Sequence, residues 1–144
     1  MRNVIALILC LFINNTAQTQ NYWQQNADYK INVDVNANNN TYKGNQEIKY
    51  TNNSRDTLNK IFFHLYFNAF KVGSDMAVRL KNGDDINTRF DVDISQLKPN
   101  EEGFLKVSNL RQDGLKVETY VSDTILEVIL ANPLEPGDSS IFTL

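Results

Sequence analysis

Two long segments near the start of the chain alternate between apolar and polar residues. Residues 27–37 carry apolar side chains at every odd position and polar ones between them, and residues 41–51 repeat the pattern less strictly. Such alternation is typical of half-exposed strands, so we expect Ile31, Val33 and Val35 to face a core. Asn38-Asn39-Asn40 supplies a turn, because asparagine tolerates left-handed backbone angles. The two segments therefore predict a long antiparallel hairpin, with Gly44 marking a bulge or a close backbone contact.

The next segment, residues 52–70, passes from a polar cluster into a run of aromatic and aliphatic residues. Period two places Ile61, Phe63, Leu65 and Phe67 on one face. A strand that is apolar on both faces must be covered on both, inside a sandwich or beneath a neighbouring domain. We therefore predict a domain interface on the other face, formed by Phe62, His64, Tyr66 and Phe70.

The remainder of the chain predicts a long loop followed by short strands. Residues 71–102 are polar and interrupted by turn residues, so they predict a loop with one short element near Ile94. Four strands are expected at residues 104–109, 115–121, 124–130 and 140–144, separated by turn signals that include Asp113-Gly114 and Pro136-Gly137. No segment has a persuasive amphipathic helical pattern. The fold class is therefore all-β, an antiparallel sandwich or curved sheet of about seven strands with one long loop. The last strand stops abruptly, so we expect a truncated end that leaves an unpaired edge.

The N-terminus has the layout of a secretory signal peptide. A short charged start is followed by the apolar run Val4–Ile13 and then by small polar residues, with a cleavage point after Ala17. Cys10 follows Leu9, whereas a lipoprotein site needs a small residue there; the other alternative is a buried N-terminal strand. The expected organisation is a signal peptide over 1–17, a lead-in over 18–26 and a β domain over 27–144. We expect export to the periplasm or the extracellular space, with no membrane span once the leader is removed.

Composition limits the partners and the source of stability. The net charge of −3 comes with scattered lysines and no basic patch, which argues against nucleic acid. The single cysteine lies in the leader, so the mature chain forms no disulfide and depends on core burial. About 125 residues are enough for one such core.

The sequence contains little catalytic chemistry. His64 is the only histidine, so a histidine-based zinc site cannot be assembled, and a core or interface role is expected for it. A Ser-His-Asp triad lacks the Gly-x-Ser-x-Gly elbow that would present the serine. Four aspartates of the long loop are candidates for calcium, but their spacing does not fit the Asp-x-Asp-x-Asp-Gly loop: Asp84, Asp85, Asp91 and Asp93. We therefore assign no catalytic, cofactor-binding or metal-binding residue.

Several short motifs together resemble the start of a known enzyme family. They are Tyr22-Trp23-Gln24-Gln25, Asp28-Tyr29-Lys30-Ile31, Tyr42-Lys43-Gly44, Asn52-Asn53-Ser54-x-Asp56-Thr57-Leu58, His64-Leu65-Tyr66-x-Asn68-Ala69-Phe70 and Leu134-x-Pro136-Gly137. In this order and spacing they resemble the N-terminal domain of secreted bacterial zinc aminopeptidases of the gluzincin class, family M1. The resemblance covers nearly the whole mature chain.

The resemblance implies a saddle-shaped β domain packed against a downstream catalytic domain. In that family a His-Glu-x-x-His helix and a further glutamate hold zinc, and a Gly-x-Met-Glu-Asn segment grips the substrate's amino group. This chain contains none of these motifs. The implied function is therefore that of a non-catalytic scaffold, with zinc and the peptide substrates bound elsewhere in the full-length enzyme. A different class of function stays open, a self-contained secreted β-sandwich that binds glycan or protein; a chaperone-like sandwich has no specific residue in its favour.

Overall fold

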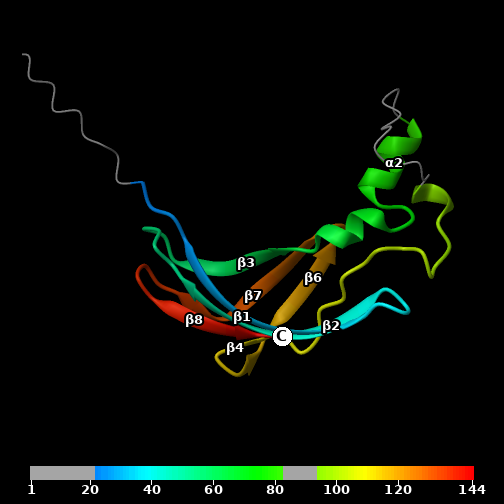
Figure 1. The fold of residues 1–144 in the computed structure, drawn as a ribbon. Coiled ribbons are helices and arrows are strands. Elements are labelled where there is room, and N and C mark those ends of the chain that lie inside the picture. The colour runs from blue at the N-terminus through cyan, green and yellow to red at the C-terminus, as the bar shows by residue number, and fades with distance from the viewer. Residues whose placement is uncertain (1–21, 83–93) are drawn as a thin grey trace, which may run out of the picture.

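The computed structural model describes residues 22–82 and 94–144, and within them it confirms the all-β fold class. Two antiparallel sheets lie one above the other (Figure 1). The larger sheet has the strand order β1-β2-β8-β4-β5, and the smaller one has the order β3-β7-β6. The strands are β1 (Asn26–Asn36), β2 (Thr41–Thr51), β3 (Leu58–His64), β4 (Arg111–Gln112), β5 (Leu115–Lys116), β6 (Glu118–Ser122), β7 (Ile125–Leu134) and β8 (Ser139–Thr143).

The predicted antiparallel hairpin is confirmed, with β1 one residue earlier at each end than the expected strand. β1 pairs with β2 without interruption, from Asn26 opposite Thr51 to Asn36 opposite Thr41. The turn depends on asparagine as expected, because Asn40 has φ +53° and the Asn38 N–H donates to Asn36 Oδ1 at 3.0 Å. The predicted turns at Asp113-Gly114 and Gly137 also hold left-handed backbone angles.

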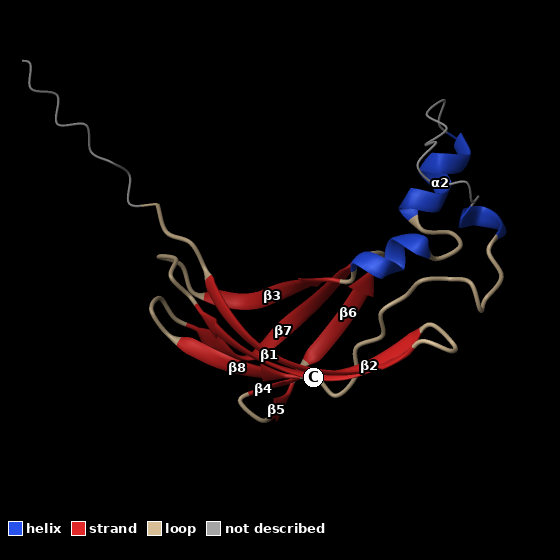
Figure 2. Cartoon of the chain, viewed as in Figure 1, coloured by secondary structure: helices blue, strands red, loops and turns tan. Residues whose placement is uncertain are grey.

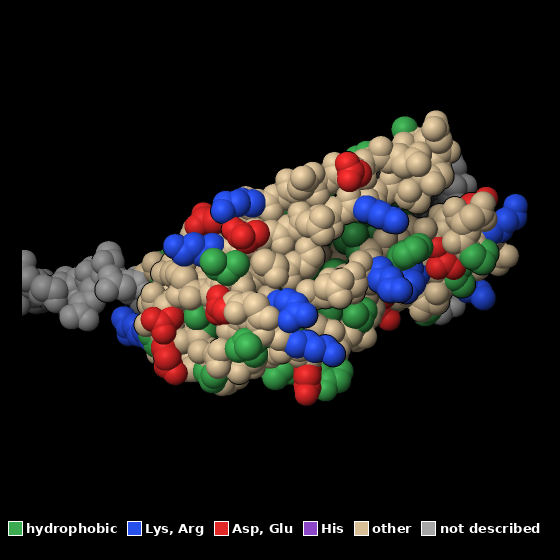
Figure 3. Space-filling model, turned by 90° about the horizontal axis from the view of Figure 1, so that it is seen from below, with side chains coloured by type: hydrophobic (Ala, Val, Ile, Leu, Met, Phe, Trp, Pro, Cys, Tyr) green, Lys and Arg blue, Asp and Glu red, His purple; other side chains and the backbone are tan. Residues whose placement is uncertain are grey.

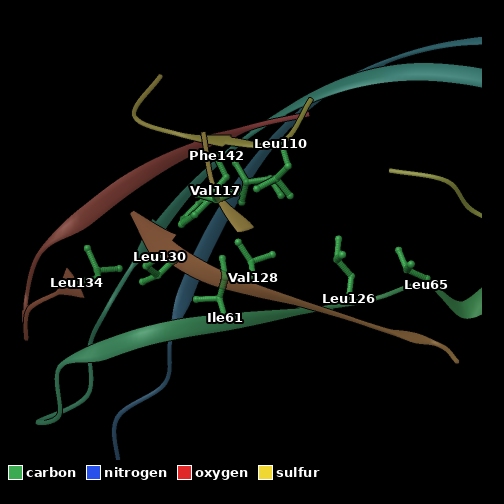
Figure 4. Close-up of a cluster of buried hydrophobic side chains, with 10 residues drawn as sticks. Ile61, Leu65, Leu110, Val117, Leu126, Val128, Leu130, Leu134 and Phe142 are labelled. Atoms are coloured by element: carbon green, nitrogen blue, oxygen red, sulfur yellow. The ribbon is translucent and has the colours of Figure 1, made fainter. Parts of the chain in front are cut away.

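The hydrophobic core lies between the two sheets at the end of the hairpin away from its turn. Phe142 points inward from the larger sheet, and Val128 of β7 and Ile61 of β3 point toward it from the smaller sheet (Figure 4). Ile48 of β2 belongs to the same buried cluster. Phe142 is fully buried and its ring meets that of Phe63 edge to face, with 6.4 Å between centroids. The core therefore depends on contacts between strands that are distant in the sequence.

The outer part of the hairpin extends beyond this core. β8 pairs only with residues Glu47–Thr51 of β2. The half of the hairpin nearer its turn therefore extends past the end of β8. Four apolar side chains of β1 are exposed rather than buried: Tyr29, Ile31, Val33 and Val35. The expectation that Ile31, Val33 and Val35 face a core is therefore wrong, because the smaller sheet does not reach over them.

Helical structure interrupts the region expected to be strand and loop. Three elements occur: η1 (Tyr66–Phe70), α2 (Asp75–Asn82) and η2 (Ile94–Gln96). They gather at one end of the sandwich (Figure 2). The prediction of no helix is thus wrong for α2, which Ser74 caps by accepting the Ala77 N–H on its Oγ at 3.1 Å. The short element near Ile94 is confirmed, and its side chain is buried.

Three expectations about the C-terminal strands need correction. The predicted strand 115–121 is divided between the two sheets: β5 ends at Lys116, Val117 is buried at the crossing, and β6 starts at Glu118. Residues 104–109 form no ladder, although their burial alternates. β8 is not an edge, because β2 and β4 pair with it on either side.

Gly44 is a close backbone contact and not a bulge. A Cβ at this position would lie 2.8 Å from the Asn32 carbonyl oxygen and 3.1 Å from Val33 Cγ2. The Asn32 carbonyl belongs to the backbone of a paired strand, so it cannot move away from a new Cβ as the end of a flexible side chain could. We therefore expect Gly44→Ala to lower the free energy of unfolding by about 1–3 kcal/mol, measured by urea denaturation. Lys43→Ala on the exposed neighbouring position is the control, and an unchanged midpoint for Gly44→Ala would contradict the contact.

Candidate functional site

The outer face of the smaller sheet carries the residues that the sequence assigned to an interface. Phe62 and His64 point outward from β3, and Phe62 is 55 % exposed. The ring of Tyr66 stacks on that of His64 with 5.0 Å between centroids and 5° between planes, so Tyr66 extends the same face from η1. Tyr66 is itself 70 % exposed. Three of the four predicted residues therefore come together.

Phe70 lies elsewhere, and the reason is a change of backbone period. The strand ends at His64, and the 3₁₀ helix that follows has three residues per turn, so residues i and i+3 share a side. Phe67 and Phe70 consequently pack together with 6.4 Å between centroids, and Phe67 reaches Tyr42 of the hairpin at the same distance. Phe70 is half-buried there. The period-two count that placed Phe70 beside His64 is wrong.

One buried asparagine fixes η1 in this position. Asn68 is 3 % exposed, and its Nδ2 donates to the Asp123 carbonyl at 3.1 Å while its Oδ1 accepts the Leu105 N–H at 2.9 Å. These bonds tie the helix both to the β6–β7 turn and to the extended segment after Gly103. The 3₁₀ helix is thereby held against the sheet, which keeps Tyr66 beside His64.

Two further members of the face were not identified from the sequence. Tyr120 of β6 and Phe62 of β3 lie in register with Glu127 of β7, one on either side of it. Tyr120 is 58 % exposed. Ile129 lies on the same face, two residues after Glu127 on β7. The alternation within 115–121 could have indicated Tyr120. We expected a single strand there, however, and the chain in fact changes sheets at Val117. We call the set of Phe62, His64, Tyr66, Tyr120 and Ile129 the aromatic face.

Charged side chains lie among the rings of the aromatic face and contact them. Lys60 Nζ lies 2.9 Å from Glu127 Oε1 and 5.7 Å from the centre of the Phe62 ring. The Tyr120 hydroxyl donates to Glu118 Oε2 at 3.3 Å. Exposed pairs of this kind contribute little to stability, so the face combines apolar area with polar groups, which suits contact with another surface.

His64 is exposed, so the core role that the sequence allowed for it is wrong. Its ring stacks on that of Tyr66. Among residues 22–82 and 94–144, no group of three metal-binding side chains occurs, and none of these residues is assigned to zinc. The four candidate calcium aspartates and the segment predicted to be a signal peptide, residues 1–17, lie outside the described residues. In the described part of the chain, no helix has the length and apolar character needed to cross a bilayer.

A broad depression of about 580 Å³ lies on the larger sheet, lined by side chains that include Lys30, Glu47 and Arg111. Its charged groups are surface groups: Lys30 is bonded to Glu47 at 2.8 Å, and this hydrogen bond, with the opposite charge, raises the pKa of Lys30. Its carboxylate, Glu47, is held in this ion pair with Lys30. The aromatic face is the stronger candidate for a functional surface.

Comparison of the chain with protein-family models, with curated proteins and with solved structures gives no match.

Proposed function

We propose that this chain is the non-catalytic N-terminal scaffold domain of an exported zinc aminopeptidase of the gluzincin class. In this proposal the enzyme removes N-terminal residues from peptides, and the aromatic face packs against its own downstream catalytic domain. Zinc and the peptide substrate bind in that catalytic domain. No step of the chemistry is assigned to this chain.

The observation that carries the proposal is the exposure of the aromatic face. Apolar surface in water costs about 25 cal/mol per Å², and large exposed apolar patches mark sites of association. Phe62, Tyr66 and Tyr120 are each more than half exposed. His64 and Tyr66 also belong to one of the motifs that carry the family resemblance, so the motif and the face coincide.

Four other residues of the resemblance have structural roles, as a scaffold requires. Asn52 is fully buried and bonds to three separate segments, and Asn68 holds η1 to the sheet. Gly44 permits the close approach of β1 and β2, and Gly137 takes a left-handed turn angle of φ +87°. Each residue type has a physical reason in the β domain itself, independent of catalysis.

The proposal is tested with a protein extended through the segment encoded after Leu144. We expect Phe62→Ser to leave the stability of the chain alone nearly unchanged, since the side chain contacts solvent. In the extended protein the same change should lower the melting temperature and the hydrolysis of an aminoacyl-anilide, because it opens a covered interface. Phe104→Ser is the matched control, as Phe104 is likewise 55 % exposed but lies outside the aromatic face.

Two results would contradict the proposal. One is an extended protein that is no more stable than the chain alone and is indifferent to Phe62→Ser. The other is a coding sequence without a His-Glu-x-x-His motif in the following domain, within about 200 residues.

A second function is favoured by the flat His64–Tyr66 stack beside Phe62. Stacked rings of this kind offer a platform for a sugar ring or a protein loop, as a self-contained binding module would need. In that case the chain alone should be as stable as the extended protein, and Tyr66→Ala should abolish binding to a glycan or protein ligand while leaving the melting temperature unchanged.

A further inference from the structure

β1 is a long edge strand with an exposed polar face. In the part of the chain that the structure describes, it ends the strand order of the larger sheet and pairs with β2 alone. Its outward side chains alternate in a short charge pattern: Asp28, Lys30, Asn32, Asp34 and Asn36. Long unpaired edges template pairing with another strand, and a charged side chain such as lysine usually prevents it. Here Lys30 lies two residues before Asn32, and Asp34 lies two residues after it. An antiparallel partner with the same sequence can therefore place a carboxylate opposite the lysine.

We propose that β1 pairs antiparallel with β1 of a second copy of this chain, about a two-fold axis at Asn32, to join the two larger sheets into one. The proposal does not depend on the proposed function above. In this register Lys30 lies opposite Asp34 of the second copy, and Asp34 lies opposite Lys30. Asn32 faces its own equivalent. The edge lysine is thus neutralised by the partner instead of repelling it.

The neighbouring strand supports the same register. β2 places Glu47 opposite Lys30, Asn45 opposite Asn32 and Lys43 opposite Asp34. Across the joined sheet one row therefore reads Glu47, Lys30, then Asp34 and Lys43 of the second copy, with charges alternating in sign. The central row consists of asparagines only. Opposite charges on directly facing residues stabilise a pair of strands and like charges destabilise it. Figure 3 shows the outer face of the larger sheet, on which both signs are interspersed.

No other register pairs as many opposite charges over as long a contact. A two-fold axis perpendicular to the sheet keeps the apolar sides of both strands on one face. The alternative registers therefore differ by two residues, and each such shift moves the axis by one residue. Moving the axis to Ile31 sets Asp28 against Asp34, and moving it to Lys30 sets that lysine against itself. An axis at Val33 pairs no charges. Pairing Lys30 with Asp28 shortens the contact to residues 26–32 and loses Val33 and Val35.

The apolar side of the hairpin gains in the same arrangement. Tyr29, Ile31, Val33 and Val35 are between 45 % and 76 % exposed. In the proposed register Ile31 lies beside Val33 of the second copy, and Tyr29 lies beside Val35. Cross-strand neighbours of this kind cover part of each other's surface. The apolar side chains of β1 that the smaller sheet does not cover thus form one continuous apolar surface across the two copies.

The charges provide a register-specific test by sedimentation of the full chain over a range of concentrations. We expect reversible dimers that weaken with added salt. Lys30→Glu places like charges together twice, and so does Asp34→Lys, so each variant alone should dimerise about tenfold more weakly or worse. Mixing the two variants restores both attractions, and we expect a heterodimer of roughly the original affinity. Lys116→Glu, at the opposite edge of the sheet on β5, makes the same charge change and should have no effect.

Disulfide trapping tests the position of the axis independently. With Cys10→Ser removing the one native cysteine, Asn32→Cys places two thiols on directly facing residues, within the separation that a disulfide spans. Asn45→Cys, on the same face one strand inward, leaves the thiols about 14 Å apart, three strand spacings. We expect rapid cross-linking of the first variant only. A chain that stays monomeric, a mixture without restored association, or equal cross-linking at both positions would overturn the proposal.

Discussion

Replacing Phe142 by alanine is expected to lower the free energy of unfolding by about 3–5 kcal/mol. Phe142 is 0 % exposed and occupies the centre of the core, where β8 lies between β2 and β4. Truncation removes its edge-to-face contact with Phe63 and leaves a cavity that strands paired on both sides cannot close. Since small domains hold only about 5–15 kcal/mol in total, this one change should remove a large share of the stability.

Chemical denaturation followed by circular dichroism measures the effect. Ile141→Ala is the matched control, because it is the preceding residue of the same strand and its side chain is 42 % exposed. We expect that control to cost no more than about 1 kcal/mol. Equal losses for both variants would mean that the core is not organised around Phe142.

Replacing Asn52 by alanine is expected to cost about 3–5 kcal/mol through hydrogen bonds and not through volume. The Nδ2 group donates to the Asp56 carbonyl at 2.8 Å and to the Leu134 carbonyl at 2.9 Å. Its Oδ1 accepts from Gln25 and from both the N–H and the hydroxyl of Ser54. Removing the amide leaves buried polar groups without partners, and such networks cost more than the sum of isolated bonds.

The neighbouring Asn53 provides the control, since it is exposed and donates only to the Gln24 carbonyl through its side chain. We expect Asn53→Ala to change the free energy of unfolding by less than about 0.5 kcal/mol. Asn52→Asp separates hydrogen bonding from size, because it keeps the volume but loses both donors. If that isosteric variant were as stable as the parent protein, the hydrogen-bond network would not be the source of the effect.

The candidate site was only partly predictable from the sequence. Period two correctly grouped Phe62 with His64, because both lie within β3. It failed at Phe70, because the Leu65 N–H donates to the Thr124 carbonyl at 2.7 Å and a 3₁₀ helix begins at the next residue. Asn68, which holds that helix through contacts with distant segments, could not be recognised from its neighbours in sequence. Tyr120 was hidden for a related reason, since the chain changes sheets at Val117.

The sequence by itself determined the features that depend on neighbouring residues. These are the antiparallel β1–β2 hairpin, the all-β class and the turns at Asn40, Gly114 and Gly137. Alternation and turn chemistry are local, so they survive in any tertiary context. Only the tertiary structure decided which apolar faces are covered. Ile31 and Ile48 share one face of the same hairpin, yet Ile48 is 2 % exposed and Ile31 is 60 % exposed. The difference arises because β8 and the smaller sheet cover Ile48 and do not cover Ile31. Alternation in the sequence shows that a strand has one apolar and one polar face, but it does not show what packs against either face.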